Sequence, residues 1–419
     1  MKLFKHICRI LVGLLFIYSG FVKGIDPLGS NYKFIEYFHA FQMDWLAGTA
    51  LFFSFFLSLS EFMMGFCLVF NLFIRWISWG ALLFMSFLTP LTLILAIKNP
   101  VSDCGCFGDA LILTNWETFW KNFIFLLITL VVFYTKETFK KTFNQLEQIT
   151  LFIGALFFMI YLTSYCYRHL PILDFRPYAI GKNIQEGMAI PEGAPQDEYE
   201  ITLEYKNKQT GEIKTFNEQN YPWQDTLNWE FVNSSEKLIK SGVHPEIQDF
   251  IIEHPEQGTI TQELLEDPTY TFLAIAYNIH HTTPKYQEQL NQLAAYAANH
   301  GYRFYGLSAS SVEEVQVYKT THQVNYDFYF MDETQLKTII RSNPGLVLLR
   351  QGTILNKWAG RDLPKPEELK GKDLTAYCIN KQQERIDKLI IWIFILGFAV
   401  CILFFLFQKH KAKHFRTIR

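Results

Sequence analysis

Long apolar blocks restrict this chain more than any other feature of its sequence. About twenty apolar residues are enough to cross the hydrocarbon core of a bilayer as a helix. Six blocks of roughly that length occur: Ile7–Val22, Leu46–Phe70, Ile74–Ile97, Trp116–Tyr134, Ile149–Tyr167 and Leu389–Phe407. Residues 169–386 have the composition of a soluble domain. We therefore predict a multi-pass α-helical membrane protein that carries one large extramembrane domain.

Basic residues in the short links predict the topology. If six helices alternate, the positive segments share one side: the N-terminus, Arg75, Lys136 with Lys140 and Lys141, and the tail after residue 408. The positive-inside rule makes that side cytoplasmic, with or without cleavage of the first helix. The segments Asp26–Asp44 and Asn99–Asn115 and the domain 169–386 then lie outside, which in a bacterium is the periplasm. We expect an inner-membrane protein in the lipid bilayer, with both termini in the cytoplasm.

Charge and hydropathy divide the chain further. A formal net charge of −2, from 38 basic and 40 acidic residues, argues against a nucleic-acid partner. The expected parts are a four-helix bundle (1–140), a fifth membrane helix (141–168), a periplasmic linker and β-hairpin region (169–267), a strand-and-helix domain with its exit segment (268–386), a sixth membrane helix (387–408) and a basic tail (409–419).

The segment Asp103-Cys104-Gly105-Cys106-Phe107-Gly108 is the most specific motif. It lies on an expected outer loop, in a compartment where disulfides form and persist. A disulfide that closes so small a ring is strained, which makes the pair oxidising and labile. We interpret Cys104 and Cys106 as a catalytic redox pair. The negative charges of Asp103 and Asp109 should raise the pKa of a nearby thiol, which favours a disulfide that waits to be attacked.

Two other interpretations of this loop stay open. Cys104 or Cys106 could form a structural bridge with Cys166 or Cys378, which lie just outside the membrane and are candidate accessory thiols. A metal site would need four ligands, and only His39 and His169 are on the same side to complete it, so we predict no metal.

Charged residues near the apolar blocks mark a second candidate site. Glu61 lies inside the second block, where a carboxylate is costly unless it is paired or protonated. It is either a proton acceptor or part of a cofactor pocket, or else a packing residue that accepts a hydrogen bond from Ser19, Ser58 or the backbone. Lys23 and Arg75 lie at helix ends, where we expect them to reach the interface.

The extramembrane region predicts a hairpin and then an α/β unit. Alternation over Tyr199–Tyr205 and Ile213–Phe216 predicts the hairpin. From Tyr270, strands and helices alternate, which implies a partly parallel sheet. Expected strands are Thr271–Tyr277, Tyr302–Ser308, Phe328–Met331, Gly345–Leu349 and Ile354–Trp358, and expected helices are Pro284–His300, Ser311–His322 and Glu333–Ile340.

The first third of the chain resembles the MauE branch of the DoxX-like membrane proteins. The resemblance is carried by the Cys-Gly-Cys loop after the third of four leading helices, and by the first-helix pattern Arg9…Gly13…Phe16…Ser19-Gly20-Phe21…Lys23…Asp26-Pro27. It implies support for disulfide formation in a periplasmic partner and quinone-linked sulfur redox chemistry. Quinone is therefore the candidate cofactor, with Glu61 as its candidate contact.

Residues 268–366 resemble a thioredoxin-like domain, in which Pro344 occupies the place of the fold's cis-proline. With Asn343, this proline is a candidate partner-binding site, because that surface binds extended peptides. Tyr277–Thr282 replaces the Cys-x-x-Cys motif, and no cysteine lies between Cys166 and Cys378. The domain therefore cannot carry out dithiol chemistry alone.

The expected function is thiol–disulfide exchange with, or maturation of, a periplasmic partner through the Cys104-Gly105-Cys106 loop. The alternative is a non-enzymatic membrane-anchored assembly or binding protein, whose thioredoxin-like domain docks a partner.

Overall fold

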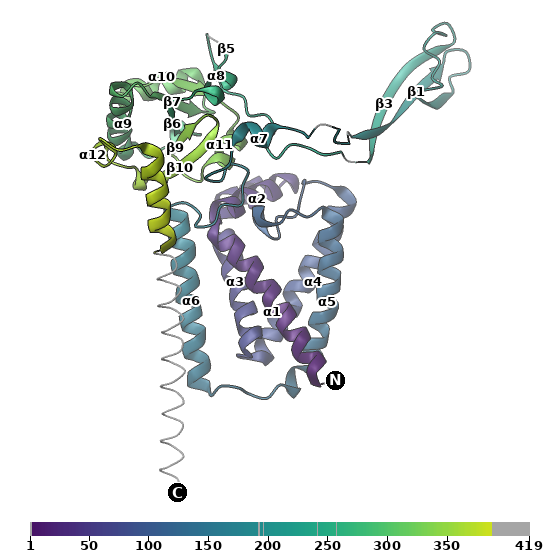
Figure 1. Cartoon of the computed structure of the whole chain (residues 1–419). Coiled ribbons are helices and arrows are strands. Elements are labelled where there is room, and N and C mark those ends of the chain that lie inside the picture. Colours follow the sequence, from purple (N-terminus) through teal and green to yellow (C-terminus); the bar gives the residue numbers. More distant parts are fainter. Residues whose placement is uncertain (1, 192, 196, 241, 257, 388–419) are drawn as a thin grey trace. The chain divides into compact units, whose positions relative to one another are not determined.

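The computed structural model describes residues 2–191, 193–195, 197–240, 242–256 and 258–387 (Figure 1). They form two compact units. One contains the residues up to 182 together with those from 251 onward, and the other is Asn183–Phe250. The sixth predicted span, Leu389–Phe407, lies outside the described residues.

Five long apolar helices confirm the first five predicted spans. They are α1 (Lys2–Ile25), α3 (Ala50–Phe70), α4 (Ile74–Lys98), α5 (Asn115–Thr135) and α6 (Gln145–Arg168). Glycines let α1 and α3 approach closely: a Cβ on Gly20 would lie 2.3 Å from the Phe62 nitrogen, and one on Gly65 would lie 2.4 Å from the Ile17 nitrogen. Small residues at such crossings are typical of membrane helices.

The links between the helices divide between two ends of the bundle. At one end, Lys5 donates to the Thr138 carbonyl (3.0 Å), Asn71 Nδ2 to the Lys140 carbonyl (2.8 Å) and the Phe73 N–H to Gln148 (2.8 Å). The N-terminus and the α3–α4 and α5–α6 links therefore meet there, as alternating helices require. The other end carries the α4–α5 loop and the helix α2 (Pro27–Ala40), whose N-terminus Asp26 caps.

The α/β part of the same unit has a sheet in the order β10-β9-β6-β7-β8-β4-β5. Its strands are β4 (Glu253–His254), β5 (Gly258–Thr259), β6 (Tyr270–Ile275), β7 (Arg303–Ser308), β8 (Phe328–Phe330), β9 (Gly345–Arg350) and β10 (Thr353–Ala359). β6, β7 and β8 are parallel, whereas β9 and β10 are antiparallel. Every residue of β6 is buried, so this strand forms the centre of the core.

Three of the α/β helices confirm the predicted ones: α9 (Gln287–Asn299), α10 (Val312–Thr321) and α11 (Glu333–Ile339). The short helices α8 (Thr261–Glu266) and α12 (Pro366–Leu369) were not predicted. The Asn343–Pro344 peptide bond before β9 is cis. This topology is that of a thioredoxin-like domain, as predicted. Short 3₁₀ helices complete the unit: η1 (Asp44–Thr49), η2 (Gly108–Ala110), η3 (Lys136–Thr138), η4 (Ile279–His281), η5 (Pro284–Tyr286) and η6 (Gly360–Asp362).

The second unit contains α7 (Ile184–Met188) and an antiparallel sheet in the order β2-β1-β3. β1 (Glu198–Asn207) and β2 (Ile213–Asn217) form the predicted hairpin. β3 (Trp229–Lys240) pairs along the other edge of β1, a pairing that the sequence pattern does not order.

Candidate functional site

The Cys-Gly-Cys segment lies in the loop between α4 and α5, and several contacts shape it. The sulfurs of Cys104 and Cys106 are 2.9 Å apart, which is near enough for them to share a proton or to join in a disulfide. Gly105 has a φ of +63°, a conformation that L side chains rarely adopt. Its N–H donates to Asp103 Oδ2 (2.8 Å), and the Lys33 ammonium donates to the other Asp103 oxygen (2.7 Å).

A buried ion pair supports the loop from within the bundle. Lys23 Nζ donates to Glu61 Oε2 (2.8 Å), to Ser19 Oγ (2.7 Å) and to the carbonyl of Cys106 (2.6 Å). The Lys23 and Glu61 side chains are 7% and 4% exposed. The expectation that Lys23 reaches the interface is therefore wrong, because Glu61 and the Cys106 carbonyl hold its ammonium inside. The expected hydrogen bond from Ser19 to Glu61 is present at 2.8 Å.

Local sequence explains how this pair forms. Ser19 and Lys23 are four residues apart on α1, so they lie on the same helix face. Gly20 lies between them and admits the backbone of α3 at Ser58 and Phe62, next to Glu61. The close crossing therefore brings the Glu61 carboxylate to the Lys23 ammonium. The Lys23 side chain is long enough to contact the Cys106 carbonyl of the loop as well.

The two thiols of the loop differ in pKa. The pKa of Cys106 is lowered to about 6, because its hydrogen bond with the Cys104 sulfur and the nearby ammonium groups of Lys121 and Lys23 stabilise its thiolate. The same hydrogen bond and burial raise the pKa of Cys104. The expectation that the flanking carboxylates dominate is not met: Asp103 is paired with Lys33, and Asp109 with Arg341. These shifts favour Cys106 over Cys104 as the thiolate of the reduced pair.

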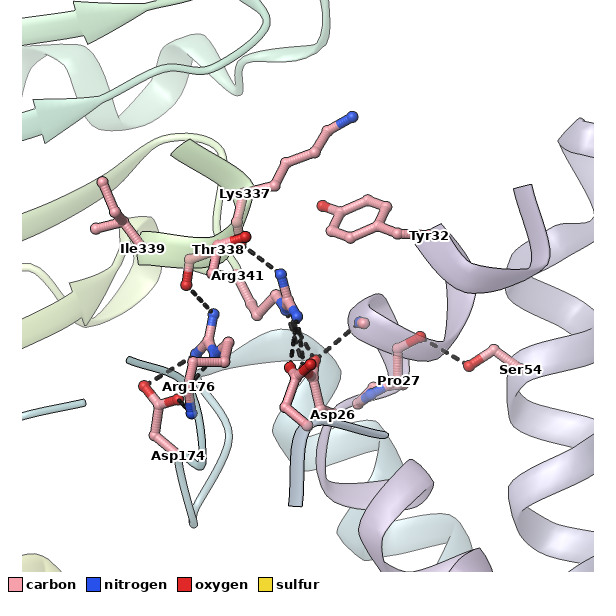
Figure 2. Close-up of polar contacts among 12 residues, drawn as sticks. Asp26, Pro27, Tyr32, Ser54, Asp174, Arg176, Lys337, Thr338, Ile339 and Arg341 are labelled. Carbon is pink, nitrogen blue, oxygen red and sulfur yellow. Dashed lines mark hydrogen bonds and ion pairs between the residues drawn. The ribbon is translucent and has the colours of Figure 1, made fainter. Parts of the chain in front are cut away.

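Arg341 connects the thioredoxin-like domain to the membrane bundle (Figure 2). Its Nε lies 3.0 Å from Asp26 Oδ2, and its Nη2 lies 3.1 Å from Asp109 Oδ2 on the Cys-Gly-Cys loop. The arginine side chain is 7% exposed. Nearby, the hydroxyls of Tyr32 and Tyr277 are 3.2 Å apart. Tyr277 occupies the position where a thioredoxin has its Cys-x-x-Cys motif, so this face of the domain contacts α2.

A second buried charge cluster holds the segment after α6 against the same domain. Arg176 Nε donates to Asp174 (2.7 Å) and its Nη1 to the Thr338 carbonyl (2.9 Å) (Figure 2). Lys357 is also paired with Asp174. Burial opposes ionisation of Asp174, but Lys357 and Arg176 lower its pKa to about 2. A cavity of about 130 Å³ lies between this segment and the loop, with Asp26, Lys33, Gly105 and Arg176 in its wall.

The remaining predicted site residues lie apart from the cysteine pair. Cys166 packs among apolar residues at the end of α6, and Cys378 lies in the thioredoxin-like core. Both are free, and neither is in bonding contact with Cys104 or Cys106. Pro344 is buried, and the Asn343 amide donates to the Asn278 carbonyl (2.7 Å). Their accessory-thiol and partner-binding roles stay predictions.

The donor groups of the described residues bear on metal binding. In the described part of the chain, no group of three or more His, Cys, Asp or Glu side chains is placed to hold a metal ion. His39 pairs with Asp44, and His169 pairs with Asp362. Both oxygens of Glu61 accept from Lys23, and one also accepts from Ser19; its role as a quinone contact stays a prediction.

Two family models match separate parts of the chain. Residues 1–135 match the family of the methylamine utilisation protein MauE. The MauE-like region thus contains the cysteine pair, Lys23 and Glu61. Residues 199–241 match a domain of unknown function, DUF8463. No curated protein matched the chain.

Two solved structures are similar to part of the chain. One is a putative protein disulfide isomerase from Bacteroides thetaiotaomicron, with 14% identity over 33% of this chain and 84% of that chain, at a TM-score of 0.23. The other is the bacterioferritin comigratory protein of Xanthomonas campestris, with 9% identity over 33% of this chain and 91% of that chain, at a TM-score of 0.21. The strand order, not these similarities, carries the assignment of the α/β fold.

Residues that the sequence analysis did not place in the site are Lys23, Lys33, Tyr37, Lys121 and Arg341. Tyr37 donates to the Cys104 carbonyl (2.8 Å), beside the Lys33–Asp103 pair. One signal was available for Lys23: two opposite charges, Lys23 and Glu61, lie in adjacent antiparallel spans. No comparable signal joins Arg341 to Asp26, 315 residues away.

Proposed function

We propose that this membrane protein exchanges disulfides with a periplasmic protein dithiol through Cys104 and Cys106. The observation that carries the proposal is the asymmetry of the pair: two sulfurs lie 2.9 Å apart, and the pKa of Cys106 is lowered whereas that of Cys104 is raised, although Lys121 lies near both. A dithiol with one low-pKa member is typical of thiol–disulfide oxidoreductases. The positive-inside rule supports an inner-membrane location with this loop on the periplasmic side.

The asymmetry assigns a role to each sulfur. A partner thiolate attacks Cys104 Sγ of the disulfide, the Cys104–Cys106 bond breaks, and Cys106 leaves as the thiolate. The lower-pKa thiol is the better leaving group. The second partner thiolate then attacks the partner's own sulfur in the mixed disulfide and releases Cys104, which takes up a proton. Two electrons pass from the partner dithiol to the pair, and the partner gains a disulfide.

No cofactor takes part in this exchange. The quinone that the family resemblance implies stays a prediction about how the reduced pair is re-oxidised, and no step above depends on it.

The thioredoxin-like domain has a supporting role in this proposal. It lacks cysteines of its own at the usual position, and its corresponding face contacts α2 through Tyr277 and Arg341. The Arg341 contact to Asp109 holds the domain on the reactive loop itself. We propose that the domain holds the loop in place and restricts which thiols reach Cys104.

Alkylation in intact cells tests the proposal. Cells that express the full chain are reduced briefly, washed and sampled over minutes, with acid quenching and a mass-tagged alkylating reagent. Cys104 and Cys106 should return together to the protected, oxidised state. Cys67→Ser, which removes a buried thiol of α3, is the matched control and should leave this recovery unchanged. The proposal fails if both thiols stay reactive throughout.

A second candidate function is a non-enzymatic assembly or binding protein. The absence of the Cys-x-x-Cys motif from the thioredoxin-like domain favours it, because a domain without that motif cannot exchange disulfides at the usual position of the fold. A peptide map under non-reducing conditions separates the two. Stable bridges from Cys104 or Cys106 to Cys166 or Cys378 would support the assembly role.

A further inference from the structure

Lys23 is a buried cation that the exchange reaction does not consume. Its ammonium has three N–H groups, and the three acceptors around it are Ser19 Oγ, the Glu61 carboxylate and the Cys106 carbonyl, at 2.6 to 2.8 Å. A charge withdrawn from water is costly unless it is paired and fully hydrogen-bonded, and here it is both.

The Lys23–Glu61 ion pair also holds the loop in place, because Lys23 donates to the Cys106 carbonyl. The carbonyl belongs to the cysteine that leaves as a thiolate, so this hydrogen bond from Lys23 fixes the backbone of that residue. Ser19, which has a single hydroxyl proton, reaches the same carbonyl and Glu61, both at 2.8 Å. The loop conformation and the ion pair are therefore one connected structure.

The charged and titratable groups that face Cys106 come from three helices and from the loop itself. α1 contributes Lys23, α3 contributes Glu61, α5 contributes Lys121, and the loop contributes the thiol of Cys104. Glu61 opposes a thiolate, but Lys23 lies between the carboxylate and the loop carbonyl. Lys121 also lies over the Phe107 ring, 4.1 Å from its centroid, so it faces the loop from a second side.

We propose that Lys23 is a positioning residue for disulfide exchange: it anchors the Cys106 carbonyl and keeps positive charge beside the sulfur that leaves, while Glu61 holds the ammonium in that place. The proposal rests on the proposed function and deepens it, because it names a buried group that, together with the Cys104 hydrogen bond and Lys121, favours Cys106 as the leaving sulfur.

The test measures the Cys106 thiol alone. In purified full-length protein that carries Cys104→Ser, the rate of Cys106 alkylation is followed against pH, with the site resolved by mass spectrometry. Lys23→Met should raise the Cys106 pKa by about one unit, which slows alkylation about tenfold at a pH below that pKa. Lys23→Arg keeps the charge and should stay within about threefold of the parent. Lys98→Met removes an exposed lysine from the end of α4 and should change nothing.

A second variant guards against misfolding. Lys23→Met alone leaves a buried carboxylate unpaired, whereas Lys23→Met with Glu61→Gln removes both charges together. The double variant should also slow alkylation, but by less than Lys23→Met, because it removes the Glu61 charge that opposes the thiolate as well. If both variants alkylate Cys106 at the parent rate across the pH range, the proposal is overturned. This result is independent of redox cycling in cells, on which the proposed function stands or falls.

Discussion

Arg341 and Asp26 are 315 residues apart in sequence, yet the guanidinium Nη2 lies 3.0 Å from the carboxylate Oδ2. Asp26 caps α2 and accepts from the Gly29 N–H, so the arginine binds the end of a helix that is already fixed. The second contact of Arg341, to Asp109, places the same side chain on the loop that carries the cysteines.

Arg341→Ala should loosen the thioredoxin-like domain from the loop. The variant leaves Asp26 and Asp109 without their cation; because water reaches both carboxylates, the cost should be less than the roughly 3 to 5 kcal/mol of a fully buried pair. Hydrogen exchange should therefore accelerate in residues 99–114 and in α11. Arg350→Ala, at an exposed position of the same domain, is the control. Equal exchange in both variants would contradict the contact.

Gly105→Ala should disturb the reactive loop. The residue has a φ of +63°, and a Cβ there would lie 2.8 Å from Lys33 Cγ. The left-handed conformation alone costs roughly 1 to 2 kcal/mol for an L residue. Gly108→Ala has a φ of +51° but meets nothing nearer than 3.5 Å, so it carries the strain without the crowding. We expect a lower yield of the Cys104–Cys106 disulfide under mild oxidant for Gly105→Ala than for Gly108→Ala.

Asp174→Asn should destabilise the thioredoxin-like domain by about 3 kcal/mol, because it leaves Lys357 and Arg176 buried without an anion. The folded-state pKa of Asp174, about 2, lies below its ordinary value of 3.8, so its contribution to stability is present above pH 4 and is lost as the pH falls toward 2. Thermal unfolding at neutral pH measures the effect. Asp327→Asn, at an exposed surface pair, should leave the melting temperature within a degree or two.

The alkylation rate of the reduced pair should fall as the pH falls. With a pKa of about 6, Cys106 is mostly thiolate at pH 7 and mostly thiol at pH 5. Its alkylation in the wild-type chain should therefore slow about tenfold between pH 7 and pH 5. Cys104, whose pKa is raised, should react later at both values. Simultaneous alkylation of both sulfurs at pH 7 would contradict the assigned asymmetry.

Much of the fold could be predicted from the sequence, because local patterns determine it. Five spans follow from apolar length, and the order of strands and helices from Tyr270 onward follows from alternation. The cysteine pair was recognisable because two thiols one glycine apart on a polar loop are not core residues. These features depend on residues that are near one another in the chain.

The parts that could not be predicted depend on crossings between distant elements. Lys23 looked like an interfacial residue, because only the close approach of α1 and α3 at Gly20 shows that Glu61 lies within its reach. The electrostatics of the thiols were inferred from Asp103 and Asp109 in the sequence. The cations that neutralise these carboxylates, Lys33 and Arg341, come from α2 and from just after α11.

Trapping the mixed disulfide tests the central claim most directly. In cells that express Cys106→Ser, the Cys104 thiolate should attack the disulfide of the oxidised partner, which reverses the proposed exchange. The partner's disulfide breaks, and the mixed disulfide should accumulate because Cys106 is no longer there to release it. The adduct runs as a higher band without reductant and disappears with it. Cys104→Ser should give much less adduct. If neither variant forms an adduct, or if Cys104 is found bridged to Cys166 or Cys378 instead, exchange through this loop is contradicted.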